Sequence, residues 1–135
     1  GMQAYVDAMG EPVDDARRVS TALLHAPASA AMARAVYGVT DPETLRAIFY
    51  HNTGRAPMGT LDKLLCVADM TEPRRKPYTW MENLRVLALS DLDAAVVEAL
   101  KRKLEFIQAR GKEAHPDTAA ALVDMEKASK QEGKA

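Results

Sequence analysis

The feature that most constrains the fold is a long apolar run at helical spacing in the second half of the chain. The run consists of Leu92, Val96, Leu100, Leu104 and Ile107. Residues spaced in this way share one face of an α-helix. Glu98 and Arg102 form an oppositely charged pair four positions apart, an arrangement that supports a helix from its outer side. The pattern predicts a helix that begins near Ser90, as its N-cap, and ends at Arg110.

Five further segments carry helix signals, and no segment carries a clear strand signal. The predicted helices span residues 26–37, 41–51, 60–70, 79–89 and 116–125. Pro27 is expected in the first turn of the first, and Thr40 or Asp41 caps the second. Aromatic residues make up only 5% of the chain, which suits helix-on-helix packing better than a sheet. We predict an all-α, compact bundle of about six helices, with one domain over residues 1–125 and a polar tail over 126–135.

Charge, hydropathy and cysteine content exclude several classes of protein. The net charge is −1, whereas a nucleic-acid-binding domain normally carries a basic excess. No apolar run approaches the ~18–20 residues that a membrane span needs. The single cysteine, Cys66, cannot form an internal disulfide and fits a reducing, cytoplasmic location. Because leucines and a valine surround Cys66, we expect an inert core thiol. The sequence thus predicts no nucleic-acid partner and no membrane partner.

Three polar residues stand at the ends of apolar helical runs. His25 opens the alanine-rich segment, His51 closes the run that ends in Ile48-Phe49-Tyr50, and Asp69 closes the run from Leu61. Imidazole and carboxylate groups are ligands that divalent transition metals use in proteins. The alternative for Asp69 is a buried carboxylate paired with His25, His51 or Arg55, because an unpaired charge there would be costly.

Four short blocks, in register over about residues 12–125, resemble one known family. They are Leu-Leu-His-Ala-Pro (residues 23–27), Tyr-His-Asn-Thr-Gly-Arg (50–55), Val-Ala-Asp followed by Glu-Pro (67–73), and His-Pro-Asp-Thr (115–118). The chain resembles the HD-domain phosphohydrolases of the YqeK type. That resemblance implies an HD-type helical fold and the hydrolysis of symmetrical dinucleoside tetraphosphates to nucleoside diphosphates.

The resemblance also implies a metal site. His25 and His51 match two histidines that would serve one divalent ion, most often iron in this family, and Asp69 matches the aspartate that would serve a second. The family's first histidine and its His-Asp pair would precede residue 1, and no His-Asp dipeptide occurs in this sequence. We therefore expect missing N-terminal helices and an incomplete metal site.

The same resemblance implies a phosphate-binding side to the site. Arg55 with Thr53, together with Arg75 and His115, match positions that would contact a nucleotide or phosphate ligand. Arg55 could instead pair with a surface acid, and His115 could simply start a helix. Asp62 is expected to be a solvated acid in the first turn of its helix.

Missing helices would leave an apolar face uncovered on segments 28–37 and 45–49. Exposed apolar patches above a few hundred Å² commonly recruit a partner. We therefore predict a homodimer that covers this face. The alternative to a metal-dependent hydrolase is a non-catalytic remnant that acts as a dimeric module and binds a nucleotide or a protein.

Overall fold

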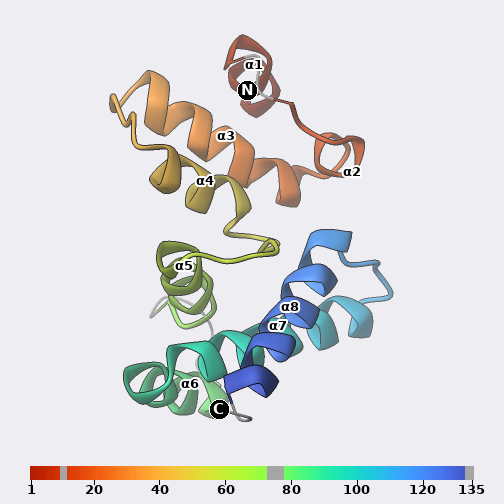
Figure 1. Cartoon of the computed structure of the whole chain (residues 1–135). Coiled ribbons are helices and arrows are strands. Elements are labelled where there is room, and N and C mark those ends of the chain that lie inside the picture. Colours follow the sequence, from red (N-terminus) through yellow and green to blue (C-terminus); the bar gives the residue numbers. More distant parts are fainter. Residues whose placement is uncertain (10–11, 73–77, 133–135) are drawn as a thin grey trace. The chain divides into compact units, whose positions relative to one another are not determined.

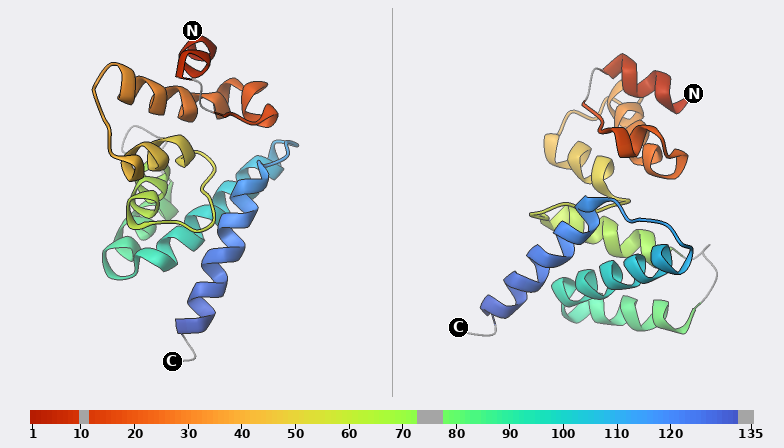
Figure 2. Two further views of the ribbon diagram at one scale, coloured as in Figure 1. Left: turned by 45° about the horizontal axis from the view of Figure 1, so that its top comes forward. Right: turned by 90° about the vertical axis from the view of Figure 1, so that its right-hand side faces the viewer.

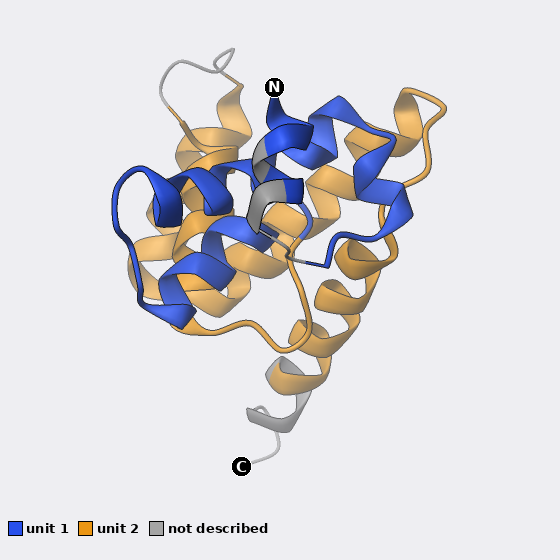
Figure 3. Cartoon of the chain, turned by 90° about the horizontal axis from the view of Figure 1, so that it is seen from above, with its two compact units in different colours: residues 1–53 blue, residues 54–135 orange. Residues whose placement is uncertain are grey.

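The structure, a computed structural model, describes residues 1–9, 12–72 and 78–132, and all of their regular structure is helical (Figure 1). The described part contains eight helices and no strand, which confirms the predicted all-α class. The chain divides into two compact units, residues 1–53 and 54–135, which Figure 3 shows in different colours.

The helices follow the chain in simple order. They are α1 (Met2–Met9), α2 (Asp15–Arg18), α3 (Thr21–Ala35), α4 (Pro42–Tyr50), α5 (Thr60–Met70), α6 (Thr79–Ser90), α7 (Leu92–Ala109) and α8 (Pro116–Glu132). Among the described residues no helix is long and apolar enough to cross a membrane.

The first unit is built on α3, against which α1, α2 and α4 all pack. Val6, Val13, Leu24 and Ala28 form its small buried core, with Phe49 packed against it. The helix begins earlier than predicted because the side chain of Ser20 accepts a hydrogen bond from the Leu23 N–H. Pro27 consequently lies inside the helix and not in its first turn, so the prediction for that residue was wrong.

The start of α4 matches its prediction. Asp41 is the N-cap, and its carboxylate accepts hydrogen bonds from both the backbone N–H and the hydroxyl of Thr44, at 3.0 and 2.6 Å. Pro42 occupies the first turn, where its lack of an N–H costs nothing. The helix ends at Tyr50, and His51 is its C-cap.

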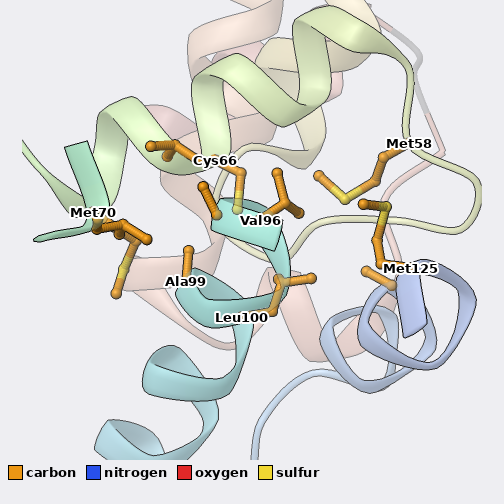
Figure 4. Close-up of a cluster of buried hydrophobic side chains, with 11 residues drawn as sticks. Met58, Cys66, Met70, Val96, Ala99, Leu100 and Met125 are labelled. Atoms are coloured by element: carbon orange, nitrogen blue, oxygen red, sulfur yellow. The ribbon is translucent and has the colours of Figure 1, made fainter. Parts of the chain in front are cut away.

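The second unit is built on α7, which packs against α5, α6 and α8; Figure 2 shows α6 and α7 side by side. Ala95, Val96, Ala99 and Leu100 of α7 are fully buried. Figure 4 shows this core. The apolar face of α7 is surrounded by Cys66 and Met70 of α5, by Met125 of α8, and by Met58, which precedes α5. Its mixture of alanine and methionine lets the helices approach closely while flexible side chains fill the gaps.

Two helix ends in this unit, the start of α7 and the end of α8, differ from their predicted positions. Asp91 caps α7 by accepting from the Ala94 N–H at 3.0 Å, whereas Ser90, the predicted N-cap, is the last residue of α6. The helix α8 continues to Glu132, beyond the start of the expected polar tail at residue 126. The predicted domain limits, 1–125 and 126–135, stay a prediction.

Gly54 opens the second unit with a left-handed backbone conformation, at φ +76°. A Cβ atom at this position would lie 3.1 Å from the Cβ of Ala121 and 3.5 Å from Cδ2 of Leu100. Both the backbone angle and the close approach of α8 therefore require a residue without a side chain.

Candidate metal and phosphate site

The first unit brings two of the predicted ligands together. His25 lies in α3 and His51 ends α4, and their imidazole rings meet edge to face with centroids 5.7 Å apart and planes 79° apart. Because a metal–imidazole bond is ~2.0–2.1 Å long, two rings that share one ion have centroids several ångströms apart. The observed separation is compatible with such sharing.

The environment of His51 fixes which ring nitrogen is available. Its Nδ1 lies 2.6 Å from the backbone carbonyl oxygen of Ile48. Because a carbonyl can only accept, Nδ1 carries a proton and donates it, so Nε2 is the nitrogen through which this ring would bind a metal. Metal-binding histidines are commonly oriented by this kind of backbone hydrogen bond.

Two contacts hold the segment that carries His51 in place. The side-chain amide of Asn52 donates to the carbonyl of Ala22, at 2.8 Å, and so ties the end of α4 to the first turn of α3 near His25. Arg17 of α2 provides the second contact. Its Nη2 donates to Oγ1 of Thr53 at 2.8 Å, and its Nη1 pairs with Asp14 at 2.6 Å.

Arg17 is buried, although it carries a charge. Only 3% of its surface is exposed, and the carbon of its guanidinium lies 5.4 Å from the ring centroid of Phe49 and 5.2 Å from that of Tyr50. A desolvated charge is tolerated only where it is paired and hydrogen-bonded. Arg17 therefore acts as a clamp around residues 49–53, the segment that includes His51.

This clamp is the functional feature that sequence reasoning missed. The spacing of Asp14 and Arg17, three positions apart, indicates an ion pair on a short helix. No local pattern indicates that the guanidinium lies against two aromatic rings of α4, because that contact joins residues more than thirty positions apart. Thr53, predicted to contact substrate, is 2% exposed, and its hydroxyl accepts from Arg17.

Arg55 and Asp62 form an ion pair in the second unit, in which Asp62 is buried and Arg55 is partly exposed. Nη2 of Arg55 donates to Oδ2 of Asp62 at 2.8 Å, and the same oxygen accepts from the Gly59 N–H at 2.8 Å. The prediction that Asp62 is solvated was wrong, since its exposed fraction is 5%. Its position in the first turn of α5 allows it to reach back to the turn before the helix, which removes it from solvent.

The remaining predicted residues also lie in the second unit or outside the described residues. Asp69 is half-buried near the end of α5. His115 precedes α8, and its Nδ1 accepts from the Asp117 N–H at 3.0 Å, so the ring caps this helix. Arg75 lies outside the described residues. Their roles in binding metal or substrate stay predictions.

Cys66 is buried and free, as predicted. Burial raises the pKa of its thiol, which keeps the group protonated at neutral pH. Burial and a protonated thiol are the properties of an inert core residue.

The two imidazoles that the first unit offers, those of His25 and His51, are suitable ligands for a divalent metal. Two imidazoles, one of them oriented by a backbone carbonyl, are ligands suited to iron, zinc and neighbouring metals. Within the part of the chain that the structure describes, neither unit gathers three or more His, Cys, Asp or Glu side chains that could hold a metal ion. The incompleteness of the metal site stays a prediction.

Proteins from three bacteria are similar in sequence to this chain, and no family model matches it. All three are named symmetrical bis(5'-nucleosyl)-tetraphosphatase. The protein from Halalkalibacterium halodurans is 37% identical over 98 residues, which are 73% of this chain and 52% of that protein. The Bacillus subtilis protein is 36% identical over 96 residues (71% and 51%), and the Staphylococcus aureus protein is 38% identical over 87 residues (63% and 44%). The chain thus spans about half the length of these relatives.

A solved structure has the same fold. It is described as an HD superfamily hydrolase involved in NAD metabolism, from Clostridium acetobutylicum. It superposes with a TM-score of 0.84 at 28% sequence identity, over 93% of this chain and 66% of that one. The sequence and fold comparisons agree with the resemblance found from the four short blocks. The chain is a homologue of the symmetrical bis(5'-nucleosyl)-tetraphosphatases and has the fold of an HD superfamily hydrolase.

Proposed function

We propose that this chain provides part of a metal-dependent phosphohydrolase site that acts on dinucleoside tetraphosphates. The observation that carries the proposal is the imidazole pair of His25 and His51, in which a backbone carbonyl orients the second ring. The names of the three relatives support the substrate class.

His25 and His51 would together hold one divalent cation, and Asp69 would be a ligand to a second. Iron is the metal that the family resemblance implies, and imidazole and carboxylate ligands are compatible with it. Such a metal, when bound, polarises a phosphate and lowers the pKa of a bound water. The chain's own contribution is orientation: the Ile48 carbonyl fixes the tautomer of His51, and Arg17 and Asn52 fix the segment that carries it.

Arg55 is the residue that we propose for binding a phosphate of the substrate, with Thr53, Arg75 and His115 as further predicted positions. A planar guanidinium suits a phosphate, and the hydrogen bond from Nη2 of Arg55 to Oδ2 of Asp62 fixes the orientation of the group. The role that fits Thr53 best is indirect, since its hydroxyl is engaged by Arg17.

The test combines metal binding with hydrolysis. We would titrate the metal-free protein with Mn²⁺, followed by calorimetry, and assay diadenosine tetraphosphate hydrolysis with added Fe²⁺ or Mn²⁺. His25→Ala and His51→Ala should each weaken Mn²⁺ binding by at least about tenfold. His115→Asn, which keeps a side-chain cap on α8, is the matched control for Mn²⁺ binding and should leave the Mn²⁺ affinity unchanged. Unchanged Mn²⁺ binding in both imidazole variants would contradict the metal site. Hydrolysis that both imidazole variants retain at the wild-type rate would contradict the catalytic part.

The second candidate, a dimeric binding module, is favoured by an exposed apolar strip at the end of α3. Met32, Val36 and Tyr37 are 39%, 57% and 75% exposed. We propose that a second copy of the chain covers this strip. Sedimentation at micromolar concentration should show a dimer that Val36→Glu converts to a monomer. A wild-type monomer would contradict this interface.

We also propose a cytoplasmic location, which the low cysteine content supports, since a sequence without a disulfide framework is typical of reducing compartments.

A further inference from the structure

One face of α3 carries a row of residues at alternating spacings of three and four positions. The row, the α3 seam, consists of Ala22, His25, Ser29, Met32 and Val36. This 3-4 spacing is the a/d pattern by which two helices pack along each other in a coiled coil. The pattern therefore indicates that this face of α3 suits a second helix.

The α3 seam faces away from the interior of the first unit. Its members are exposed or half-buried, whereas Pro27, Ala30 and Ala31 on the opposite side of the helix are buried. Met32 and Val36 are 39% and 57% exposed. No Asp, Glu, Lys or Arg belongs to the seam, so two seams can meet without charge repulsion. Its small members also let two helix backbones approach closely.

The α3 seam contains one of the two imidazoles that are proposed to hold a metal. The other, that of His51 at the end of α4, meets the ring of His25 edge to face, with centroids 5.7 Å apart. Within one copy of the chain, the described residues bring no group of three His, Cys, Asp or Glu side chains together. Because structural zinc-type sites have four protein ligands, this pair supplies half of such a site.

A second copy supplies the matching half if the two α3 helices lie parallel. In a parallel pair with a two-fold axis along the helices, each seam residue faces the same residue of the other copy. His25 then faces its own counterpart, and each copy brings its His51 to the same point. In an antiparallel pair centred on the seam, His25 would face Met32 of the other copy, and the two imidazole pairs would lie about 10 Å apart along the helices.

We propose that two copies of the chain pair in parallel along the α3 seam and hold one divalent transition-metal ion between them. The four ligands are His25 and His51 of each copy. This shared site rests on the proposed metal role of the two histidines and adds the second copy to it. Four imidazoles suit ions such as Zn²⁺ and Co²⁺ in tetrahedral coordination. The carbonyl of Ile48, which accepts from Nδ1 of His51, leaves Nε2 as the nitrogen that binds the ion.

The first experiment measures stoichiometry and association together. The metal-free full chain is titrated with Zn²⁺ by calorimetry, and its sedimentation equilibrium is measured with and without the metal. We expect one ion for every two chains. With free Zn²⁺ at 100 times the dissociation constant of the shared site, linkage should make the dimer about 100-fold tighter. Co²⁺ in place of Zn²⁺ should show the visible absorption of a tetrahedral ion in the dimer.

Three variants make the test specific. His25→Ala should abolish the tightening by Zn²⁺ while association of the metal-free chains persists. Met32→Lys places like charges between the copies and should separate them. It should also weaken Zn²⁺ binding by at least about tenfold, the loss that changing even one residue behind a ligand typically causes. Glu113→Ala removes an exposed carboxylate from the second unit and should leave both the stoichiometry and the tightening unchanged.

Cross-linking tests the parallel orientation. In the parallel pair Val36 faces its own counterpart, so Val36→Cys should form a covalent dimer under mild oxidation, since a disulfide needs Cα atoms no more than about 7 Å apart. An antiparallel pair would place the two new thiols at opposite ends of the contact. Ser90→Cys, at an exposed position of the second unit, is the matched control and should stay monomeric. The native thiol of Cys66 is buried in both proteins.

The outcomes separate the shared site from the proposed metal role of the histidines. One Zn²⁺ ion per chain at every protein concentration would overturn the shared site and leave that metal role intact. The absence of both Zn²⁺ and Mn²⁺ binding would overturn the two together. A dimer whose affinity does not change with Zn²⁺ would overturn the shared site alone, as would cross-linking of the Val36→Cys protein no faster than that of the Ser90→Cys protein.

Discussion

Replacement of Gly54 by alanine should destabilise the second unit by two separable effects. The first is backbone strain, because φ at this position is +76° and a left-handed conformation costs a residue with a side chain ~1–2 kcal/mol. The second is steric, because the new Cβ would lie 3.1 Å from the Cβ of Ala121. Overpacking of this kind typically costs ~1–3 kcal/mol. Together the two effects predict a loss of about 2–5 kcal/mol.

Gly111 offers a matched control in the same unit. Its φ is +70°, and a Cβ there would meet no atom within 4 Å, so Gly111→Ala carries the strain without the clash. The difference between the two variants therefore measures the steric part, about 1–3 kcal/mol. Ala121→Gly removes the atom that the new methyl group would meet. The cost of Gly54→Ala, measured in the Ala121→Gly protein, should therefore fall close to that of Gly111→Ala.

Urea unfolding followed by the fluorescence of Trp80 suits this comparison. Trp80 is the single tryptophan of the chain and packs against the core of the second unit. With a urea m-value of ~1–3 kcal/mol per molar, a difference of 1–3 kcal/mol moves the midpoint by roughly 1 M. Equal midpoints for Gly54→Ala and Gly111→Ala would refute the argument from close approach. The absence of rescue by Ala121→Gly would show that a different neighbour sets the cost.

Further predictions concern the core, the buried thiol and a helix cap. Leu100→Ala removes a side chain that is fully buried and should cost ~2–5 kcal/mol in the same urea assay; a loss below 1 kcal/mol would contradict its central position. Since burial raises the pKa of Cys66, Ellman's reagent at pH 8 should modify it only after unfolding in urea, and rapid modification of the native protein would contradict that burial. Hydrogen bonds from Thr44 lower the pKa of Asp41, so this cap contributes stability above about pH 4, which is lost as the pH falls through the folded-state value. Asp41→Asn should remove this pH dependence, which acid titration of both proteins by circular dichroism would measure.

The sequence predicted the helices best where local signals decide their limits. The segment 60–70 was predicted at its observed bounds, and Asp41 was one of the two expected caps of α4. The start of α3 was predicted at Ala26 because Pro27 was assigned to the first turn. The hydroxyl of Ser20, six residues before Ala26, caps the helix instead. Proline is favoured in a first turn but does not require one.

The candidate site shows where local reasoning stops. The family resemblance carried by the four blocks implied that His25 and His51 belong to one site, and the structure places their rings edge to face. The burial of Asp62 and of Arg17 was not predicted. Arg17 is buried against residues more than thirty positions away in the sequence, and Asp62 is buried by the turn that precedes α5. Neither hydropathy nor charge spacing indicates such contacts.

The four-residue helix that carries Arg17 could not persist as an isolated peptide, since a helix this short does not repay the cost of its first turn. Its order therefore depends on the side chain that it buries. If residues 14–18 open, the guanidinium returns to water and the aromatic residues before His51 lose their cover at the same moment. Amide hydrogen exchange along residues 14–18 and 49–53 should consequently rise and fall together, so that a brief opening of the smallest helix also releases the segment that carries His51.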